Sequence, residues 1–219
     1  STGEKIKYRP FLVKEQKILM MAQESKNETE VLNAMTSLVS DCTFDVVDAK
    51  NSPMFDVEFI FLRIRGKSIG EKIELNLTCE DDGETQVPYE LNLEEVGVNM
   101  TEDHTTEIDI GNDVKIHFRY PYLKDMMGIP ETINETEKSF YVLNSCINSI
   151  HYGDDVYNKV DLSDKDINDF VDQLTTEQFE KVMEFFNSMP KIRHTVTFVN
   201  PKTQAMNEVV LEGLESFLE

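Results

Sequence analysis

The spacing of the apolar residues changes along the chain from a helical period to alternation and back, and this order of patterns restricts the possible folds. Helical spacing runs through six segments: 9–25, 27–42, 52–70, 134–150, 163–173 and 175–188. Alternation runs through four segments: 72–79, 86–93, 105–110 and 114–120. A last hairpin is expected around NPKT, before a short C-terminal helix. Helices and strands come in blocks rather than in βαβ order. The sequence therefore predicts an α+β fold, with helical N-terminal and C-terminal segments and small antiparallel β-hairpin modules.

These patterns divide the chain into three segments. Residues 1–70 are an N-terminal helical segment, and residues 71–130 are an acidic antiparallel β module. Residues 131–219 are a helical segment that ends in a β-hairpin and a short helix. Neither boundary has the composition of a flexible linker, so we expect the three segments to pack as one unit.

Residues 52–70, SPMFDVEFIFLRIRGKSIG, fit both a helix and a strand. Apolar side chains recur at i, i+4 and i+7, namely Phe55, Phe59 and Leu62. Ser52 suits a helix cap, Pro53 a first helical residue and Gly66 a stop, so we predict a helix. A strand is the alternative, because a second apolar set alternates: Ile60, Leu62 and Ile64.

Four basic residues lie within ten positions of a chain whose formal net charge is −21: Arg63, Arg65, Lys67 and Lys72. A phosphate site, a nucleic-acid contact or a partner surface would each explain this patch. RGKSIG lacks the upstream glycine of a P-loop and precedes a strand, which disfavours phosphate binding. The 42 acidic residues against 21 basic ones repel nucleic acid and anionic membranes, so we expect neither as a partner. Cations at a helix C-terminus complement its dipole, and the rest of the patch is expected to hold an acidic hairpin of this chain or of a neighbouring subunit.

Residues 73–114 carry thirteen acidic side chains and neither lysine nor arginine. A solvated β face is the simplest explanation, followed by a docking face for a basic partner and then by a metal site. The segments EDDGET and DLSDKDIND do not supply the ligand spacing of a calcium loop. We therefore predict neither a metal nor another cofactor.

The chain has three cysteines, Cys42, Cys79 and Cys146, and their odd number and wide spacing favour reduced thiols over disulfides. Cys79 precedes a hairpin turn, where zinc-ribbon ligands often lie, but a ribbon needs two ligand pairs. The matching position in CEDD is Asp82, and the late hairpin VTFVNPKTQAM has no cysteine. A buried thiol is therefore the preferred interpretation of Cys79.

No arrangement of residues in the sequence points to catalysis. The sequence contains neither Gly-x-Ser-x-Gly nor His-Glu-x-x-His, and its nine glycines leave little for cofactor loops. We expect no enzymatic activity and assign no catalytic residues. No stretch approaches the roughly 18 apolar residues that a membrane span needs.

Five segments occur in an order and spacing that is similar to a known family: YRPFLVKEQKILMMAQES, FDVEFIFLRIRGKSIGE, LTCEDDGE, FEKVMEFFNSMPKIRH and LEGLESFLE. Together they cover about residues 7–218. The set resembles the T-even-type bacteriophage baseplate protein family, whose members are baseplate hub subunits and hub assembly factors. Some relatives resemble a zinc ribbon in carrying cysteine pairs in the two hairpins, and this sequence keeps only Cys79 of that pattern.

The resemblance implies a non-enzymatic structural or assembly protein of a contractile tail baseplate, made in the host cytoplasm. It implies other baseplate hub or tail proteins as partners within a multi-subunit assembly. Eleven positions match the family segments and are the expected partner-binding residues: Arg9, Pro10, Phe11, Lys14, Glu15, Arg63, Arg65, Lys67, Ser68, Gly70 and Glu71. The alternative is a metal-dependent hydrolase associated with the tail hub, for which the acidic block is the motive.

Overall fold

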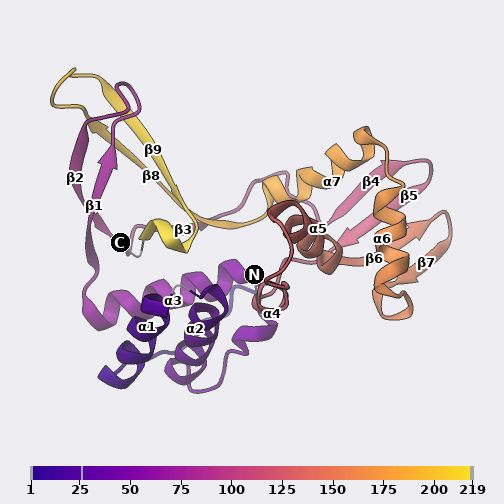
Figure 1. Cartoon of the computed structure of the whole chain (residues 1–219), viewed down its shortest axis with the longest axis horizontal. Helices are drawn as coiled ribbons and strands as arrows, with labels where there is room; N and C mark the ends of the chain where they lie inside the picture. The colour runs from indigo at the N-terminus through magenta and orange to yellow at the C-terminus, as the bar shows by residue number, and fades with distance from the viewer. Residues whose placement is uncertain (1, 26, 218–219) are drawn as a thin grey trace. The chain divides into compact units, whose positions relative to one another are not determined.

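The structure, a computed structural model, describes residues 2–25 and 27–217. Its contacts divide the chain into two compact units (Figure 1). Unit 1 comprises residues 1–99 and 190–219, and unit 2 comprises residues 100–189. Within the described residues there are seven α-helices and nine strands, and every strand pair is antiparallel. The α+β prediction is therefore confirmed, while the three-segment division of the sequence stays a prediction.

Three helices begin unit 1: α1 (Val13–Ser25), α2 (Glu28–Cys42) and α3 (Met54–Ile69), with a 3-10 turn η1 (Ala49–Asn51) between the last two. The side chain of Asn27 caps α2 by accepting a hydrogen bond from the backbone N–H of Glu30 at 3.1 Å. α2 packs against both α1 and α3. The apolar side chains of α2 and α3 form the buried interior here, and Val39 and Leu62 are fully inaccessible to solvent. Burial of these side chains stabilises helices that would be marginal on their own.

The helical interpretation of residues 52–70 is correct, but both predicted ends are wrong. Pro53 is the N-cap and Met54 the first helical residue, without a capping bond from a side chain. Gly66 lies inside the helix, buried against Glu71 and Leu93, and the helix continues to Ile69. The positive φ of 121° occurs at Gly70 instead. Glycine adopts that conformation without a steric penalty, so Gly70 ends the helix and Gly66 serves close packing.

Two hairpins complete unit 1. β1 (Lys72–Thr78) pairs with β2 (Gln86–Asn92), and β8 (Lys191–Val199) pairs with β9 (Met206–Glu212) and with the short β3 (Gly97–Asn99). Along β1 burial alternates strictly, so that Ile73, Leu75 and Leu77 face the interior. These strands confirm the predicted first hairpin and the predicted hairpin around NPKT. The 3-10 turn η3 (Leu214–Phe217) follows, and Phe217 is fully buried.

Unit 2 contains a four-stranded antiparallel sheet whose strands lie in sequential order. Along the chain, two helices come between the second and third strands, and two more follow the fourth strand. Its strands are β4 (Glu107–Gly111), β5 (Val114–Phe118), β6 (Ile147–Tyr152) and β7 (Asp155–Asn158). Its helices are α4 (Leu123–Met127), α5 (Glu135–Cys146), α6 (Asp164–Asp172) and α7 (Thr176–Ser188), and the 3-10 turn η2 (Lys159–Asp161) follows β7. The interior joins one sheet face to α5, α6 and α7, and Phe118 stacks on Phe185 at 4.9 Å between ring centroids.

The predicted helix over residues 134–150 is wrong in its last part. The helix ends at Cys146, and Ile147 begins β6, which the sequence analysis missed together with β7. The buried residues Leu143, Cys146, Ile147 and Ile150 keep a helical i, i+3, i+4, i+7 spacing across the junction. That pattern therefore does not distinguish helix from strand. Pairing of Ile150 with Ile116 on β5, a long-range contact, decides in favour of the strand.

Helix α3 carries a carboxyl group in a position that disfavours its charge. Burial raises the pKa of Glu58 to about 7, and the nearby charge of Glu215 adds to this, while a hydrogen bond from the backbone of Leu214 opposes it. The folded state therefore holds the Glu58 proton more tightly than the unfolded chain, whose pKa is near 4.5. The stabilisation that protonated Glu58 gives is present below pH 4.5 and is lost as pH rises through about 7.

No helix among the described residues has the length and apolar composition required to cross a bilayer.

We expect Glu58→Gln to remove this pH dependence. At pH 5 the variant and the parent should have nearly equal free energies of unfolding. At pH 8 the variant should be more stable by roughly 1–3 kcal/mol, because the neutral amide avoids the cost of a buried charge. Urea titrations at the two pH values measure the difference. An equal difference between variant and parent at both pH values would contradict the assignment.

Candidate functional site

The two groups of predicted partner-binding residues meet in unit 1. One group lies in residues 9–15, before and at the start of α1, and the other in residues 63–71, at the end of α3; together they are called the α3 joint. The backbone N–H of Phe11 donates to Ser68 Oγ at 2.9 Å, across 57 positions of sequence. Ser68 Oγ in turn donates to the carbonyl oxygen of Ile64 at 2.5 Å. The structure therefore brings together two groups of predicted residues that lie far apart in the sequence.

An ion pair orders the first part of the α3 joint. Arg9 Nη2 lies 3.0 Å from Glu15 Oε1, and Lys14 Nζ lies 3.2 Å from the same oxygen. The other carboxylate oxygen of Glu15 accepts the backbone N–H of Leu12 at 2.6 Å, which caps the start of α1. Burial alone would raise the pKa of Glu15, but these donors, Arg9 first, lower it to about 2. Glu15 is thus a buried structural carboxylate rather than an open contact.

Arg63 fastens α3 to the chain that follows β2. Its guanidinium donates to the carbonyl oxygens of Leu93 at 2.7 Å and Val96 at 2.8 Å, and it lies over the ring of Phe59 at 4.7 Å. Nearby, Lys67 pairs with Glu71 and lies 3.3 Å from Glu94. Part of the basic patch therefore binds acidic and carbonyl groups of its own chain. Of the two expected partners, an acidic hairpin of this chain or of a neighbouring subunit, these contacts agree with the first.

The α3 joint has no room for a ligand. The crevice lined by Tyr8, Arg63, Lys67 and Leu93, among others, has a volume of about 20 Å³. That is close to the space of a single water molecule. The residues left toward solvent are Pro10, the Lys14 ammonium with 67% of its side chain exposed, Lys67 and Gly70. Arg65 is half-buried, and burial lowers the pKa of its guanidinium.

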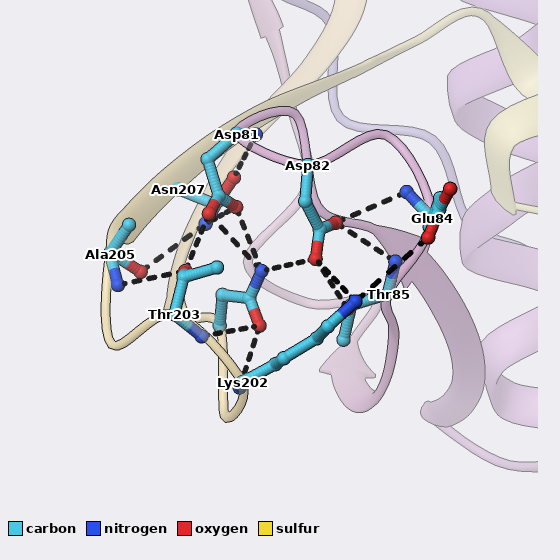
Figure 2. A network of polar contacts seen from close by, with 9 residues as sticks. Asp81, Asp82, Glu84, Thr85, Lys202, Thr203, Ala205 and Asn207 are labelled. Atoms are coloured by element: carbon cyan, nitrogen blue, oxygen red, sulfur yellow. Dashed lines mark hydrogen bonds and ion pairs between the residues drawn. The ribbon is translucent and has the colours of Figure 1, made fainter.

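A second polar site joins the tips of the β1–β2 and β8–β9 hairpins. Figure 2 shows its carboxylates and amides facing one another, and we call it the hairpin clasp. Its members are Asp81, Asp82, Thr85, Asn200, Thr203 and Asn207. Asn207 Oδ1 accepts the backbone N–H groups of Glu80 and Asp81 at 2.8 and 3.1 Å. The amide nitrogen of Asn207 donates to Asp81 Oδ1 at 2.8 Å.

Asn200 is the centre of the hairpin clasp and is fully buried. Its amide nitrogen lies 2.9 Å from Asp81 Oδ1 and 3.1 Å from Asp82 Oδ2, and so bridges the two carboxylates. Its amide oxygen accepts the backbone N–H of Lys202 at 2.8 Å. Since one buried amide satisfies donors and acceptors from both hairpins, its removal leaves several polar groups unpaired.

Hydrogen bonds keep both carboxylates of the hairpin clasp charged. Donation from the Thr85 hydroxyl and backbone lowers the pKa of Asp82 well below its usual range. Donation from Thr203, at 2.5 Å, and from Asn200 lowers the pKa of Asp81. Lys202 Nζ lies 3.9 Å from Asp82, so a cation also faces the pair. The carboxylates are thus hydrogen-bond acceptors in use, not free acids or bases.

The two hairpin tips have the same turn. In one, the N–H of Gly83 donates to the carbonyl of Cys79, and in the other, the N–H of Gln204 donates to the carbonyl of Asn200, each at 2.9 Å. Gly83 and Gln204 both have positive φ, 67° and 63°. The first and fourth residues of each turn carry the spacing of a zinc-ribbon ligand pair. The second pair here consists of Asn200 and Thr203, which bring hydrogen-bond donors.

The residues present do not fit a metal in this arrangement. Within residues 2–25 and 27–217, one group of three metal-ligand types comes together, Cys79, Asp81 and Asp82, with ligand atoms within 4.8 Å. Their carboxylates already accept bonds from Asn200 and Asn207, whose N–H groups are donors. Burial, and then the charges of Asp81 and Asp82, raises the pKa of the Cys79 thiol. The metal-dependent hydrolase alternative therefore receives no support from this cluster.

Sequence reasoning noted Asp82 and NPKT but missed the hairpin clasp. The missing cysteine pairs at the hairpin tips argue against a zinc ribbon and give no indication of a hydrogen-bonded site. The available signal was the repeated spacing of polar residues at the first and fourth positions of both turns, CEDD and NPKT. The contribution of Asn207, on a strand rather than in a turn, had no such signal.

Comparison with known proteins adds the following. A family described as T4 bacteriophage base plate protein matches residues 1–219. A similar curated protein is the baseplate hub assembly protein gp26 of Enterobacteria phage T4. It is 26% identical over 217 residues, which cover 98% of this chain and 92% of that protein. No solved structure gives a significant match.

We expect Asn200→Ala to destabilise unit 1 by about 2–4 kcal/mol, because Asp81 and Asp82 would face each other without their shared donor. Urea unfolding measures this loss. Thr197→Ala, at an exposed position of β8, is the control and should change stability by less than about 0.5 kcal/mol. Addition of a chelator should leave the parent unchanged. A loss of stability on chelation would show that a metal, not the amide, closes the tips.

Proposed function

Because the chain belongs to the family of T4 bacteriophage base plate proteins, we propose that it is a non-enzymatic assembly or structural protein of a contractile tail baseplate hub. The observation that carries this proposal is the length of the match. The family covers residues 1–219, and the relative named for hub assembly aligns over 217 residues. Both units therefore lie within the similarity.

The polar clusters of the structure support a role in contacts rather than in chemistry. The hairpin clasp and most of the α3 joint use their charged groups to hold the fold, with partners at 2.6–3.1 Å. A protein that acts through protein–protein contacts needs a rigid surface and no reactive group. We propose that the partners are other baseplate hub or tail proteins, met first in the host cytoplasm and then in the tail baseplate.

The outer side of the α3 joint is the proposed partner surface. All eleven residues predicted for partner binding remain part of this proposal, in two roles. Arg9, Phe11, Glu15, Arg63 and Ser68 position the surface from within. The residues that would touch the partner are the exposed Pro10, Lys14, Lys67 and Gly70, together with the partly exposed Arg65 and Glu71. Neither nucleic acid nor a membrane is proposed, because the net charge of −21 disfavours both.

Mass spectrometry of purified virions and of tail assembly intermediates tests the proposed function. We expect the chain in hub-containing intermediates. Its persistence in finished particles would assign it as a structural subunit, and its presence in intermediates alone would assign it as an assembly factor. Absence from both would refute a role in the baseplate.

Two sets of substitutions separate contact with a partner from support of the fold. Arg63→Gln removes donors to two carbonyl groups and should lower stability by about 1–3 kcal/mol. Lys14→Gln combined with Arg65→Gln should change stability by less than about 1 kcal/mol, because Arg9 still pairs with Glu15, but should reduce incorporation into the hub several-fold. Thermal unfolding and quantitative mass spectrometry of assembly intermediates measure the two effects. If the Lys14 and Arg65 variant assembled normally, the α3 joint would be an internal brace only.

A further inference from the structure

Unit 2 has an open apolar groove, which shares no residues with the α3 joint or the hairpin clasp. It has a volume of about 270 Å³ and is lined by Val114, Ile150, Tyr152, Tyr157, Leu162, Asp166 and Phe170. Six of these seven residues are apolar or aromatic, and they come from β5, β6, β7, the segment before α6, and α6 itself. The groove therefore extends the interior of unit 2 to its surface between the sheet and α6.

Large apolar side chains around this groove remain exposed. Tyr152 is 58% exposed and Tyr157 46%. Every residue of β7, the edge strand beside the groove, is exposed. Clustered exposure of this kind marks an interaction surface more often than single exposed residues do.

The rim of the groove is acidic. Residues 153–172 contain seven aspartates and two lysines. Asp155 is the cross-strand partner of Tyr152, so their side chains lie on the same face of the sheet. Asp166 lines the groove directly, and its carboxylate is kept charged by hydrogen bonds from Ser163, which lower its pKa. Lys165 pairs with Asp169, and Lys159 donates to the carbonyl of Asn144 at 2.6 Å, so the segment keeps a formal charge of −5, from seven aspartates and two lysines.

These charges decide between the possible occupants. An anionic occupant, such as nucleic acid or an acidic membrane, is repelled by the rim. A second copy of this chain carries a net charge of −21 and is repelled as a whole. An extended strand would pair with the exposed backbone edge of β7 and would leave the groove unfilled, because side chains of a sheet face and of α6 line the groove. An amphipathic helix with basic flanks satisfies both the apolar floor and the rim.

We propose that the groove between the unit 2 sheet and α6 binds a basic amphipathic helix of another protein, with one or two bulky apolar side chains inserted among Tyr152, Tyr157 and Phe170 and with Lys or Arg facing the aspartates. This inference rests on the proposed function, because it gives the chemistry of one partner in the hub. The groove belongs to unit 2 and the α3 joint to unit 1, so the two proposed contacts use different residues.

Fluorescence polarisation with a labelled peptide tests this inference. The probe is a 14-residue helix-forming peptide with leucine on one face and lysine elsewhere, and its twin carries glutamate in place of lysine. We expect the lysine peptide to bind with a Kd on the order of 1–100 μM, and to bind more weakly as salt rises. The glutamate peptide should not bind at the same concentrations.

Matched variants locate the binding. Asp154→Lys with Asp155→Lys reverses two charges beside the groove, and Glu102→Lys with Asp103→Lys makes the same change elsewhere on unit 2. The first pair should weaken binding of the lysine peptide at least tenfold, and the second less than threefold. Tyr157→Glu should also weaken it at least tenfold without changing the circular dichroism spectrum. Equal effects of the two charge pairs would overturn the proposal, since binding would then follow net charge alone.

Two further outcomes would also overturn the proposal. One is concentration-dependent dimerisation of the chain in sedimentation that Tyr157→Glu abolishes, because the occupant would then be a second copy. The other is equal binding of both peptides, because binding to the groove would then be nonspecific and independent of peptide charge. Failure of peptide binding by a chain that mass spectrometry finds in hub intermediates would remove this inference and leave the proposed function standing. Absence from those intermediates would instead remove the proposed function.

Discussion

The hydrogen bonds of two buried amides, Asn200 and Asn207, hold together a unit made from distant parts of the chain. Unit 1 is built from two stretches of the chain, residues 1–99 and 190–219, and the residues between them form unit 2. Its two hairpins meet at their tips, where Asn200 bridges Asp81 and Asp82 at 2.9–3.1 Å. A buried amide is stable only when its donors and acceptors are all satisfied, so the two tips are stable only together. The arrangement of both hairpins therefore depends on this contact.

The basic patch of α3 has a divided role. Arg63 satisfies the carbonyl groups of Leu93 and Val96, while Lys67 pairs with Glu71 at the surface. In an acidic chain, such pairs remove local repulsion between α3 and the residues after β2. Of the remaining basic residues of the α3 joint, Lys14 is exposed and Arg65 is half-buried, whereas the groove of unit 2 includes Asp166 in its lining.

Much of the fold was accessible from the sequence because its signals are local. Alternation over residues 72–79 and 86–93 corresponds to β1 and β2, and Asn27 caps α2 as its residue type suggests. The signals failed where two local patterns coincide. Residues 143–150 continue a helical spacing into β6, and only pairing of β6 with β5 makes them a strand. Glycine commonly ends a helix, but Gly66 packs against Leu93 and lies inside α3.

By itself, the sequence determined the α+β class, the acidic character, the family resemblance and the two segments that form the α3 joint. Periodicity, charge and residue order carry this information, and they do not depend on contacts between distant residues. The tertiary structure alone decided that Phe11 meets Ser68, that Asn200 occupies the space between Asp81 and Asp82, and that Tyr152, Tyr157 and Phe170 line one groove. The first two of these join residues 57 and 119 positions apart, and the third requires β6, β7 and α6 to pack together. Side-chain identity alone does not specify which polar or apolar groups will meet.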